Sequence, residues 1–92
     1  MNIDITYSKA SLKFMRKNPQ AGTLQDIQSI LITSLKKIFH QEDVTVDVKQ
    51  LRGNWQGYYR IRKGKIRIIF SIREEKTVAV FVHTIDFRGN VY

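Results

Sequence analysis

The sequence predicts an α+β fold in the order β-α-α-β-β-β, with a helical hairpin packed on one face of a mainly antiparallel sheet. Three observations predict it. Residues 2–7 alternate apolar and polar side chains, residues 24–40 repeat apolar residues every three or four positions, and residues 57–86 contain three alternating segments separated by turn residues. No linker, internal repeat or low-complexity segment interrupts the chain, so we expect residues 1–92 to form a single domain.

Local signals set the ends of the first strand and of both helices. Alternation predicts a strand over residues 2–7. Ser8 is a suitable N-cap for a helix over about residues 9–18, and Thr23 is a suitable N-cap for a second helix over about residues 24–40. The residues that we expect these helices to bury are Leu12, Phe14, Met15, Leu24, Ile27, Ile30, Leu31, Ser34, Leu35 and Ile38.

The C-terminal half of the chain predicts a three-stranded meander. We expect strands over about residues 57–62, 65–73 and 76–86, joined by two-residue turns at Lys63-Gly64 and Glu74-Glu75. Gly64 suits the first turn, because Gly tolerates the positive φ that tight hairpin loops require. A weak strand before the meander is indicated by the alternation of Val44, Val46 and Val48.

This register divides the sheet into two faces. It places Arg60 opposite Arg67 and Arg62 opposite Lys65. The first face, which we expect to lie under the helices, contains Tyr59, Ile61, Ile66, Ile68, Phe70, Ile72, Ala79, Phe81 and His83. The second face contains Arg60, Arg62, Lys65, Arg67, Ile69, Val78, Val80 and Val82. Because the second face is basic at one end and aliphatic at the other, we expect a protein partner to cover part of the aliphatic end.

A charge excess accompanies this basic face. Sixteen Lys and Arg residues against eight Asp and Glu residues give a net charge of +8, which implies a polyanionic partner, either nucleic acid or an acidic protein. Cations that face each other on adjacent strands destabilise a sheet by a few tenths to about 1 kcal/mol per pair. Two such pairs indicate a surface that binds an anion; the alternative is a solvated basic face.

Other chemistries find little support in the sequence. The chain has no Cys, and its two His residues have no carboxylates grouped near them, so we expect no metal and no cofactor. We expect His83 to be structural and His40 to interact with the dipole at the end of its helix. Asp86 either orients Arg88 or ends the last strand. Without a transmembrane-length apolar run or a signal-peptide layout, we expect a soluble cytoplasmic protein that does not contact a membrane.

Four segments, residues 59–70, 74–76, 80–82 and 87–92, together with the order of the elements, resemble the RelE/ParE toxin superfamily. The resemblance covers nearly the whole chain. Its most specific parts are the hairpin, with Arg67 on the strand after the turn, and the terminal Arg-x-x-Val-Tyr. One departure is Phe87, which stands where many relatives carry a His before the C-terminal arginine.

The resemblance to the RelE branch implies a toxin of a type II toxin–antitoxin pair. Such toxins enter the ribosomal A site and cleave messenger RNA without a metal, by attack of the RNA 2′-hydroxyl. The implied partners are a cognate antitoxin and the 70S ribosome with its mRNA and rRNA, while a DNA operator would be bound only through the antitoxin complex. The implied catalytic residues are Arg60, Arg62, Arg67, Arg88 and Tyr92.

Further residues extend the expected RNA-binding surface. Lys49, Arg52, Lys63 and Lys65 add positive charge around the hairpin, and Phe87 either stacks on a base or packs in the core. Two other functions remain open. The ParE branch implies a DNA gyrase inhibitor, and a non-catalytic nucleic-acid-binding module would hold RNA or DNA without cleaving it.

Overall fold

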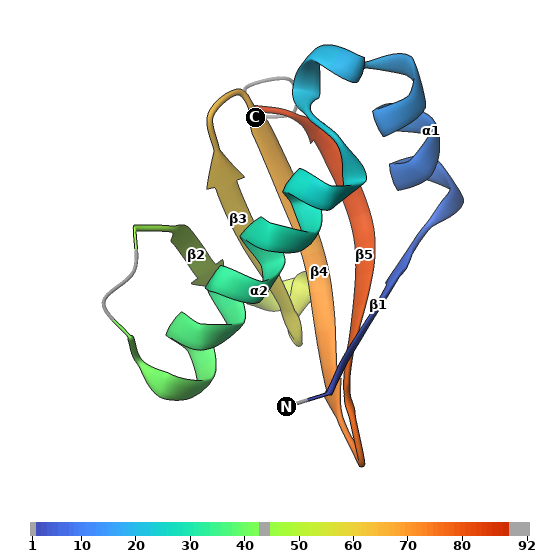
Figure 1. The fold of residues 1–92 in the computed structure, drawn as a ribbon. Helices are drawn as coiled ribbons and strands as arrows, with labels where there is room; N and C mark the ends of the chain where they lie inside the picture. The colour runs from blue at the N-terminus through green and yellow to red at the C-terminus, as the bar shows by residue number, and fades with distance from the viewer. Residues whose placement is uncertain (1, 43–44, 89–92) are drawn as a thin grey trace.

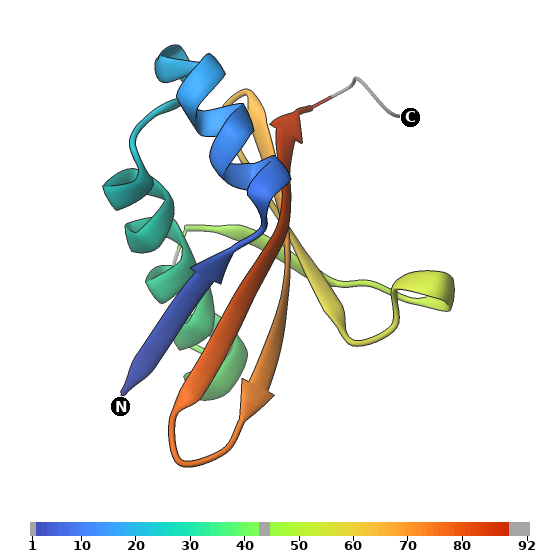
Figure 2. The ribbon, with the colours of Figure 1, turned by 90° about the vertical axis from the view of Figure 1, so that its right-hand side faces the viewer.

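The computed structural model describes residues 2–42 and 45–88. Five strands form one open sheet in the order β1-β5-β4-β3-β2, in which β1 is parallel to β5 and all other neighbours are antiparallel. Two helices cover one face of this sheet, as Figures 1 and 2 show. The predicted α+β fold class is confirmed. The strands are β1 Ile3–Tyr7, β2 Asp47–Gln50, β3 Tyr58–Lys63, β4 Ile66–Glu74 and β5 Val78–Phe87.

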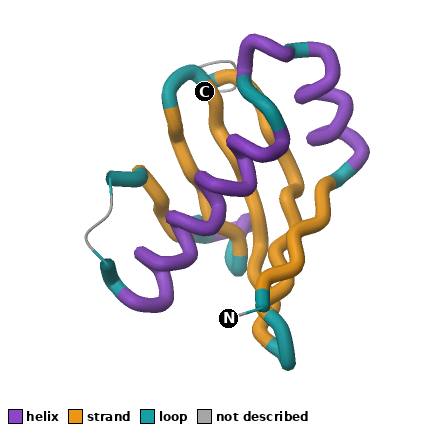
Figure 3. Tube along the Cα trace, in the orientation of Figure 1, coloured by secondary structure: helices purple, strands orange, loops and turns teal. Residues whose placement is uncertain are grey.

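Both helices begin at the predicted caps. In α1 (Lys9–Lys17), the Ser8 hydroxyl accepts a hydrogen bond from the Ser11 amide at 3.0 Å. In α2 (Leu24–His40), Thr23 and Asp26 form a reciprocal capping box. A 3₁₀ turn, η1 (Pro19–Ala21), joins the helices, and Figure 3 shows this connection on the helical side of the sheet.

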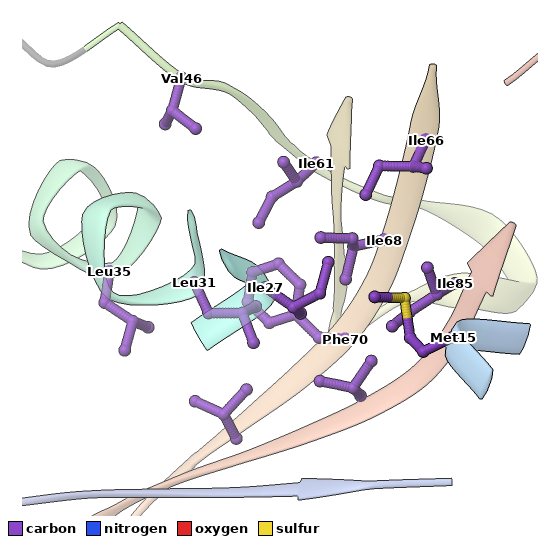
Figure 4. Packing of buried hydrophobic residues seen from close by; sticks show 12 residues of the cluster. Met15, Ile27, Leu31, Leu35, Val46, Ile61, Ile66, Ile68, Phe70 and Ile85 are labelled. Atoms are coloured by element: carbon purple, nitrogen blue, oxygen red, sulfur yellow. The ribbon is translucent and has the colours of Figure 1, made fainter. Parts of the chain in front are cut away.

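The core lies between α2 and the central strands. Ile27, Leu31 and Leu35 of α2 pack against Ile61 of β3 and Phe70 of β4 (Figure 4). All five side chains are nearly or completely inaccessible to solvent, and burial of such apolar side chains stabilises the fold.

Two residues predicted to be buried are exposed instead. Leu12 is 38% exposed and Leu24 is 41% exposed. In α1 the buried positions are Ser11 and Met15, and the Ser11 hydroxyl donates to the Val82 carbonyl oxygen at 3.3 Å. The small Ser11 therefore marks the close approach of α1 to β5, and this orientation turns Leu12 to the solvent.

The β3–β4 hairpin turns one residue later than predicted. Gly64 and Lys65 form the turn, with Gly64 at a φ of 58°, and Lys63 pairs with Ile66. Arg62 therefore lies opposite Arg67, so the predicted pairs of Arg62 with Lys65 and of Arg60 with Arg67 are wrong. Because moving the turn by one residue changes each cross-strand partner by two positions, an even number, the residues of β3 and β4 keep their predicted faces.

The face assignment of the first part of β5 is reversed. The turn before β5 begins one residue later than predicted and contains three residues rather than two, so Phe70 pairs with Val82 instead of Ala79. Val80 and Val82 are completely buried on the helix-covered face, whereas Phe81 is exposed on the other. The aliphatic surface that we expected a protein partner to cover therefore does not exist. A register shift between Ile69 and Phe70 then changes the pairing in the last part of β5.

The weak strand predicted around Val44, Val46 and Val48 is also displaced. The observed strand, β2, starts at Asp47 and pairs with β3. Val46 is buried just before it, and Val44 lies outside the described residues.

Candidate nucleic-acid interface

Four charged residues form a row across the sheet face opposite the helices, which we call the open face. In register, Asp47 of β2 pairs with Arg62 of β3, Arg62 with Arg67 of β4, and Arg67 with Asp86 of β5. This charge row thus sets two cations side by side, with a carboxylate at each end. The flanking carboxylates offset the repulsion between the arginines. The row therefore destabilises the sheet less than the two predicted cationic pairs would without neighbouring carboxylates.

The contacts within the charge row are close. Arg67 donates from Nε to Asp86 Oδ1 at 3.0 Å and from Nη2 to Asp86 Oδ2 at 2.6 Å. Arg62 donates from Nε to Asp47 Oδ2 at 2.9 Å. Asp86 therefore neither orients Arg88 nor simply ends the strand, the two alternatives that the sequence left open; it binds Arg67 at two points.

Arg60 lies next to this row and is 92% buried, since only 8% of its surface is exposed. Its Nη1 lies 3.7 Å from Asp47 Oδ2, and within the described residues this buried nitrogen has no hydrogen-bond acceptor. A buried donor without an acceptor costs about 1–3 kcal/mol, and more when the group is charged. The ion pair with Asp47 thus leaves the hydrogen bond of this nitrogen unmade.

An open groove of about 850 Å³ runs beside Arg60, along β2 and β3. Four cations line this basic groove: Lys49, Arg52, Arg60 and Arg62. The structure therefore brings together four residues that the sequence predicted for RNA contact or catalysis.

The electrostatics of the groove act on Asp47. Partial burial favours a higher pKa for this carboxyl, but the hydrogen bond from Arg62 and the charges of Arg60, Arg62 and Arg88 outweigh it and hold the pKa below its ordinary value. Asp47 is thus ionised at neutral pH, and it neutralises part of the arginine charge.

Other predicted site residues lie elsewhere. Lys63, Lys65 and Phe87 line a hollow of about 600 Å³ between α2 and the hairpin turn, on the side of the helices. Phe87 packs edge-to-face on Phe14 with ring centroids 4.9 Å apart, which is the core-packing alternative.

Arg88 is exposed and anchors the end of β5 to the hairpin turn. Its Nη1 donates to the Gly64 carbonyl oxygen at 3.0 Å, and its backbone amide donates to the Lys65 carbonyl oxygen at 2.7 Å. Tyr92, predicted to be catalytic, lies outside the described residues.

A group of aromatic rings on the open face was missed by the sequence analysis. The aromatic cluster consists of Trp55 from the 3₁₀ turn η2 (Gly53–Trp55), Tyr58, Phe81 and His83. We expected His83 under the helices, which is wrong because the face of β5 is reversed. Trp55 lies 5.1 Å from His83 and 5.3 Å from Tyr58 between ring centroids.

The described residues offer no site for a metal: no group of three or more His, Cys, Asp or Glu side chains gathers among them. His40 is the exposed last residue of α2, at the position predicted for interaction with the helix dipole. None of the described helices is both long enough and apolar enough to cross a membrane.

Comparison by sequence finds no matching family model and no matching curated protein. Comparison by structure finds similar chains. The E. coli DinJ-YafQ toxin-antitoxin complex matches with a TM-score of 0.66 at 15% identity, covering 100% of this chain and 99% of that one. A YoeB/ParE toxin from Agrobacterium tumefaciens matches with a TM-score of 0.62 at 14% identity, over 92% of this chain and 98% of its own.

A YoeB dimer from Staphylococcus aureus is also similar, with a TM-score of 0.60 at 15% identity, over 96% of this chain and 99% of its own. All three similar structures are of toxins, and they match along nearly their full length. The elements, their order and the sheet of this chain are accordingly those of the RelE/ParE toxin superfamily, whose fold it has.

Proposed function

We propose that this chain is the toxin of a type II toxin–antitoxin pair and acts as a ribosome-dependent, metal-independent endoribonuclease that cleaves mRNA in the A site. The observation that carries the proposal is the gathering of Arg60, Arg62 and Arg67 on the open face, with a buried Arg60 nitrogen that has no acceptor among the described residues. The fold shared with toxins such as YafQ and YoeB supports it.

The chemistry needs little from the protein beyond position and charge. The RNA 2′-hydroxyl oxygen bonds to the adjacent phosphorus, the bond to the 5′-oxygen breaks, and the products carry a 2′,3′-cyclic phosphate and a 5′-hydroxyl. Negative charge on the phosphate oxygens must be stabilised in the transition state, and guanidinium groups remain charged and match these oxygens geometrically.

Each arginine has a role in this scheme. Arg67, oriented by Asp86, stabilises the scissile phosphate, while Arg60 and Arg62 bind the phosphate oxygens beside it. Arg88 adds a contact from the end of β5. The resemblance assigns to Tyr92 the orientation of the 2′-hydroxyl or stacking on a base.

Outside the reacting phosphate, the basic residues divide into two groups. Lys49 and Arg52 follow the RNA backbone along the basic groove. Lys63 and Lys65 lie on the side of the helices, where contact with rRNA suits them better than contact with the scissile phosphate.

The proposed partners follow from the same surface. The similar YafQ structure is of a complex with an antitoxin, and we propose a cognate antitoxin as partner here too. It would supply acidic side chains that mask the basic groove. The 70S ribosome would hold the mRNA in the orientation that this small open site does not impose, and a protein with this role would act in the cytoplasm. Operator DNA would be contacted only through the antitoxin complex.

Primer extension on a defined mRNA in a purified translation system tests the proposal. The wild type should produce discrete breaks in the A site, and Arg67→Ala should reduce cleavage by about 100-fold or more. Arg73→Ala is the matched control, because Arg73 is an exposed arginine on the same strand, outside the charge row. Thermal melting of each variant separates loss of chemistry from loss of folding.

The alternatives give different results. Intact mRNA accompanied by DNA breaks in a gyrase assay would identify a gyrase inhibitor. Salt-dependent RNA binding without cleavage of either polymer would identify a binding module. Either outcome would overturn the proposed endoribonuclease.

A further inference from the structure

We propose that the aromatic cluster is a stacking platform for an unpaired RNA base next to the scissile site, an inference that rests on the proposed function. The cluster lies on the open face with the charge row. Tyr58 of β3, Ser71 of β4 and Phe81 of β5 pair in register and form a second row across the sheet. Only the row that contains Arg60 and Ile69 separates it from the charge row.

The cluster is continuous with the basic groove at two places. Tyr58 precedes Arg60 by two residues on the same face of β3, a separation of about 7 Å along the strand. Arg52 lines the groove and is the N-cap residue of η2, the turn that carries Trp55. A polynucleotide whose phosphates follow the groove therefore brings its bases past these rings.

The geometry of the rings leaves surface for a ligand. The contacts within the cluster have interplanar angles between 82° and 90°, so no ring is stacked face to face on another. Trp55 and Phe81 are each 39% exposed, although large aromatic side chains normally bury their faces in a core. An edge-to-face arrangement with exposed rings is suited to receive a flat aromatic ligand.

The surrounding charge favours a nucleobase over an apolar protein segment. Cations line the neighbouring groove, and the whole chain carries a charge of +8. Proteins that bind single-stranded nucleic acid combine such a groove with aromatic side chains, because every base has a π face. A hydrogen bond between His83 Nδ1 and Thr84 Oγ1, at 2.6 Å, orients the His83 ring.

The test uses the fact that Trp55 is the only tryptophan of the chain, so that tryptophan emission, excited at a wavelength that tyrosine does not absorb, reports on the cluster alone. The full chain is titrated with a short oligo(A) RNA, and in parallel with an oligomer of the same length in which abasic sites replace the bases. The two carry the same phosphate charge. We expect the RNA to quench the Trp55 emission to a saturating level, while the abasic oligomer leaves it unchanged.

Substitutions in the aromatic cluster then show how much each ring contributes to RNA binding. Trp55→Leu and Phe81→Leu should each weaken binding of labelled RNA by about 10-fold or more, and Trp55→Phe should restore most of it. The salt dependence should stay as in the wild type, because no phosphate contact is lost. Leu24→Ala is the matched control, since Leu24 is an equally exposed apolar residue on α2.

Several results would overturn the inference. One is equal quenching by the abasic oligomer, and another is wild-type RNA affinity in both leucine variants. A third is a Trp55 emission spectrum that changes with protein concentration while sedimentation experiments show a dimer. This result would make the cluster a contact between two copies of the chain. Binding with base-dependent quenching but without mRNA cleavage would reject the endoribonuclease and leave the platform standing. Cleavage of mRNA without quenching of Trp55 would reject the stacking platform and leave the endoribonuclease standing.

Discussion

At the scale of single residues, the pair of Arg67 and Asp86 holds a largely buried guanidinium in one orientation on the open face of the sheet. The two hydrogen bonds, at 3.0 and 2.6 Å, fix the plane of the Arg67 head group, and only 7% of this residue is exposed. A group that must stabilise developing charge is most effective when it is already oriented, because no reorganisation is then needed during the reaction. Asp86 is thus a positioning residue in the proposed site.

Replacing Asp86 should affect stability as well as activity. Asp86→Ala removes the carboxylate from a guanidinium that is almost fully buried, so we expect a loss of about 3 kcal/mol in the free energy of unfolding, measured by urea denaturation. Asp86→Asn keeps an acceptor oxygen and should lose about 1–2 kcal/mol. An unchanged denaturation midpoint in Asp86→Ala would show that the pair contributes nothing to folding.

The carboxyl at the other end of the charge row predicts a pH dependence. Partial burial opposes ionisation of Asp47, but Arg62, Arg60 and Arg88 together lower its folded-state pKa below 3.8. A lowered pKa stabilises the folded state above the unfolded pKa, and this contribution is lost as the pH falls through the folded pKa. Asp47→Asn should therefore destabilise the protein at neutral pH and cease to do so in acid.

The expected size of this effect is at most about 1 kcal/mol, because the Asp47 side chain is 48% exposed and its ion pairs are screened by solvent. Unfolding free energies of wild type and Asp47→Asn, measured from neutral pH to pH values below 3.8, provide the check. A difference between the two proteins that stays constant over this range would contradict the assignment.

At the scale of elements, the helices were predictable because their ends are local. Ser8 and Thr23 bond to amides three residues away, so the sequence alone identifies the caps. The register of β5 was not predictable in this way. The turn begins one residue later and is one residue longer than predicted, and this odd shift in register reverses the side chains up to the bulge, since side chains alternate with a period of two. The sequence around Glu74-Glu75 does not specify loop length.

The same cause explains which parts of the site could be predicted. Arg60, Arg62 and Arg67 were placed on the correct face, because the error in the β3–β4 turn left their alternation unchanged. The partnership of Asp86 and the aromatic cluster were missed, because both depend on the true pairing of β5.

The capping box of α2 predicts a specific loss of stability. The Thr23 hydroxyl accepts from the Asp26 amide at 3.1 Å, and the Thr23 amide donates to the Asp26 carboxylate at 2.8 Å. Thr23→Ala should cost about 1 kcal/mol in thermal or urea unfolding. Thr33→Ala is the control within the same helix, because the Thr33 hydroxyl only donates back to the Ser29 carbonyl oxygen, a bond that does not stabilise helices. Equal effects of the two substitutions would reject the cap as the cause.

At the scale of the whole molecule, part of the excess positive charge lies along the basic groove. If the four cations of the basic groove contact RNA phosphates, the logarithm of the binding constant should fall against the logarithm of salt concentration with a slope of about −3. Lys49→Ala should make this slope shallower by about 0.7. Lys13→Ala changes the net charge equally, but Lys13 lies exposed on α1, and we expect no change in slope. Equal effects of both variants would indicate a response to net charge alone.

The sheet order has a consequence for how the protein is made. β5 lies between β1 and β4, so the last of the described strands to leave the ribosome occupies the interior of the sheet. Until β5 emerges, β1 has no strand to pair with, and Asp86 cannot yet bind Arg67. The charge row is therefore assembled only after β5 has been made. A chain whose β5 has not yet been made therefore lacks the complete charge row on which the proposed activity depends.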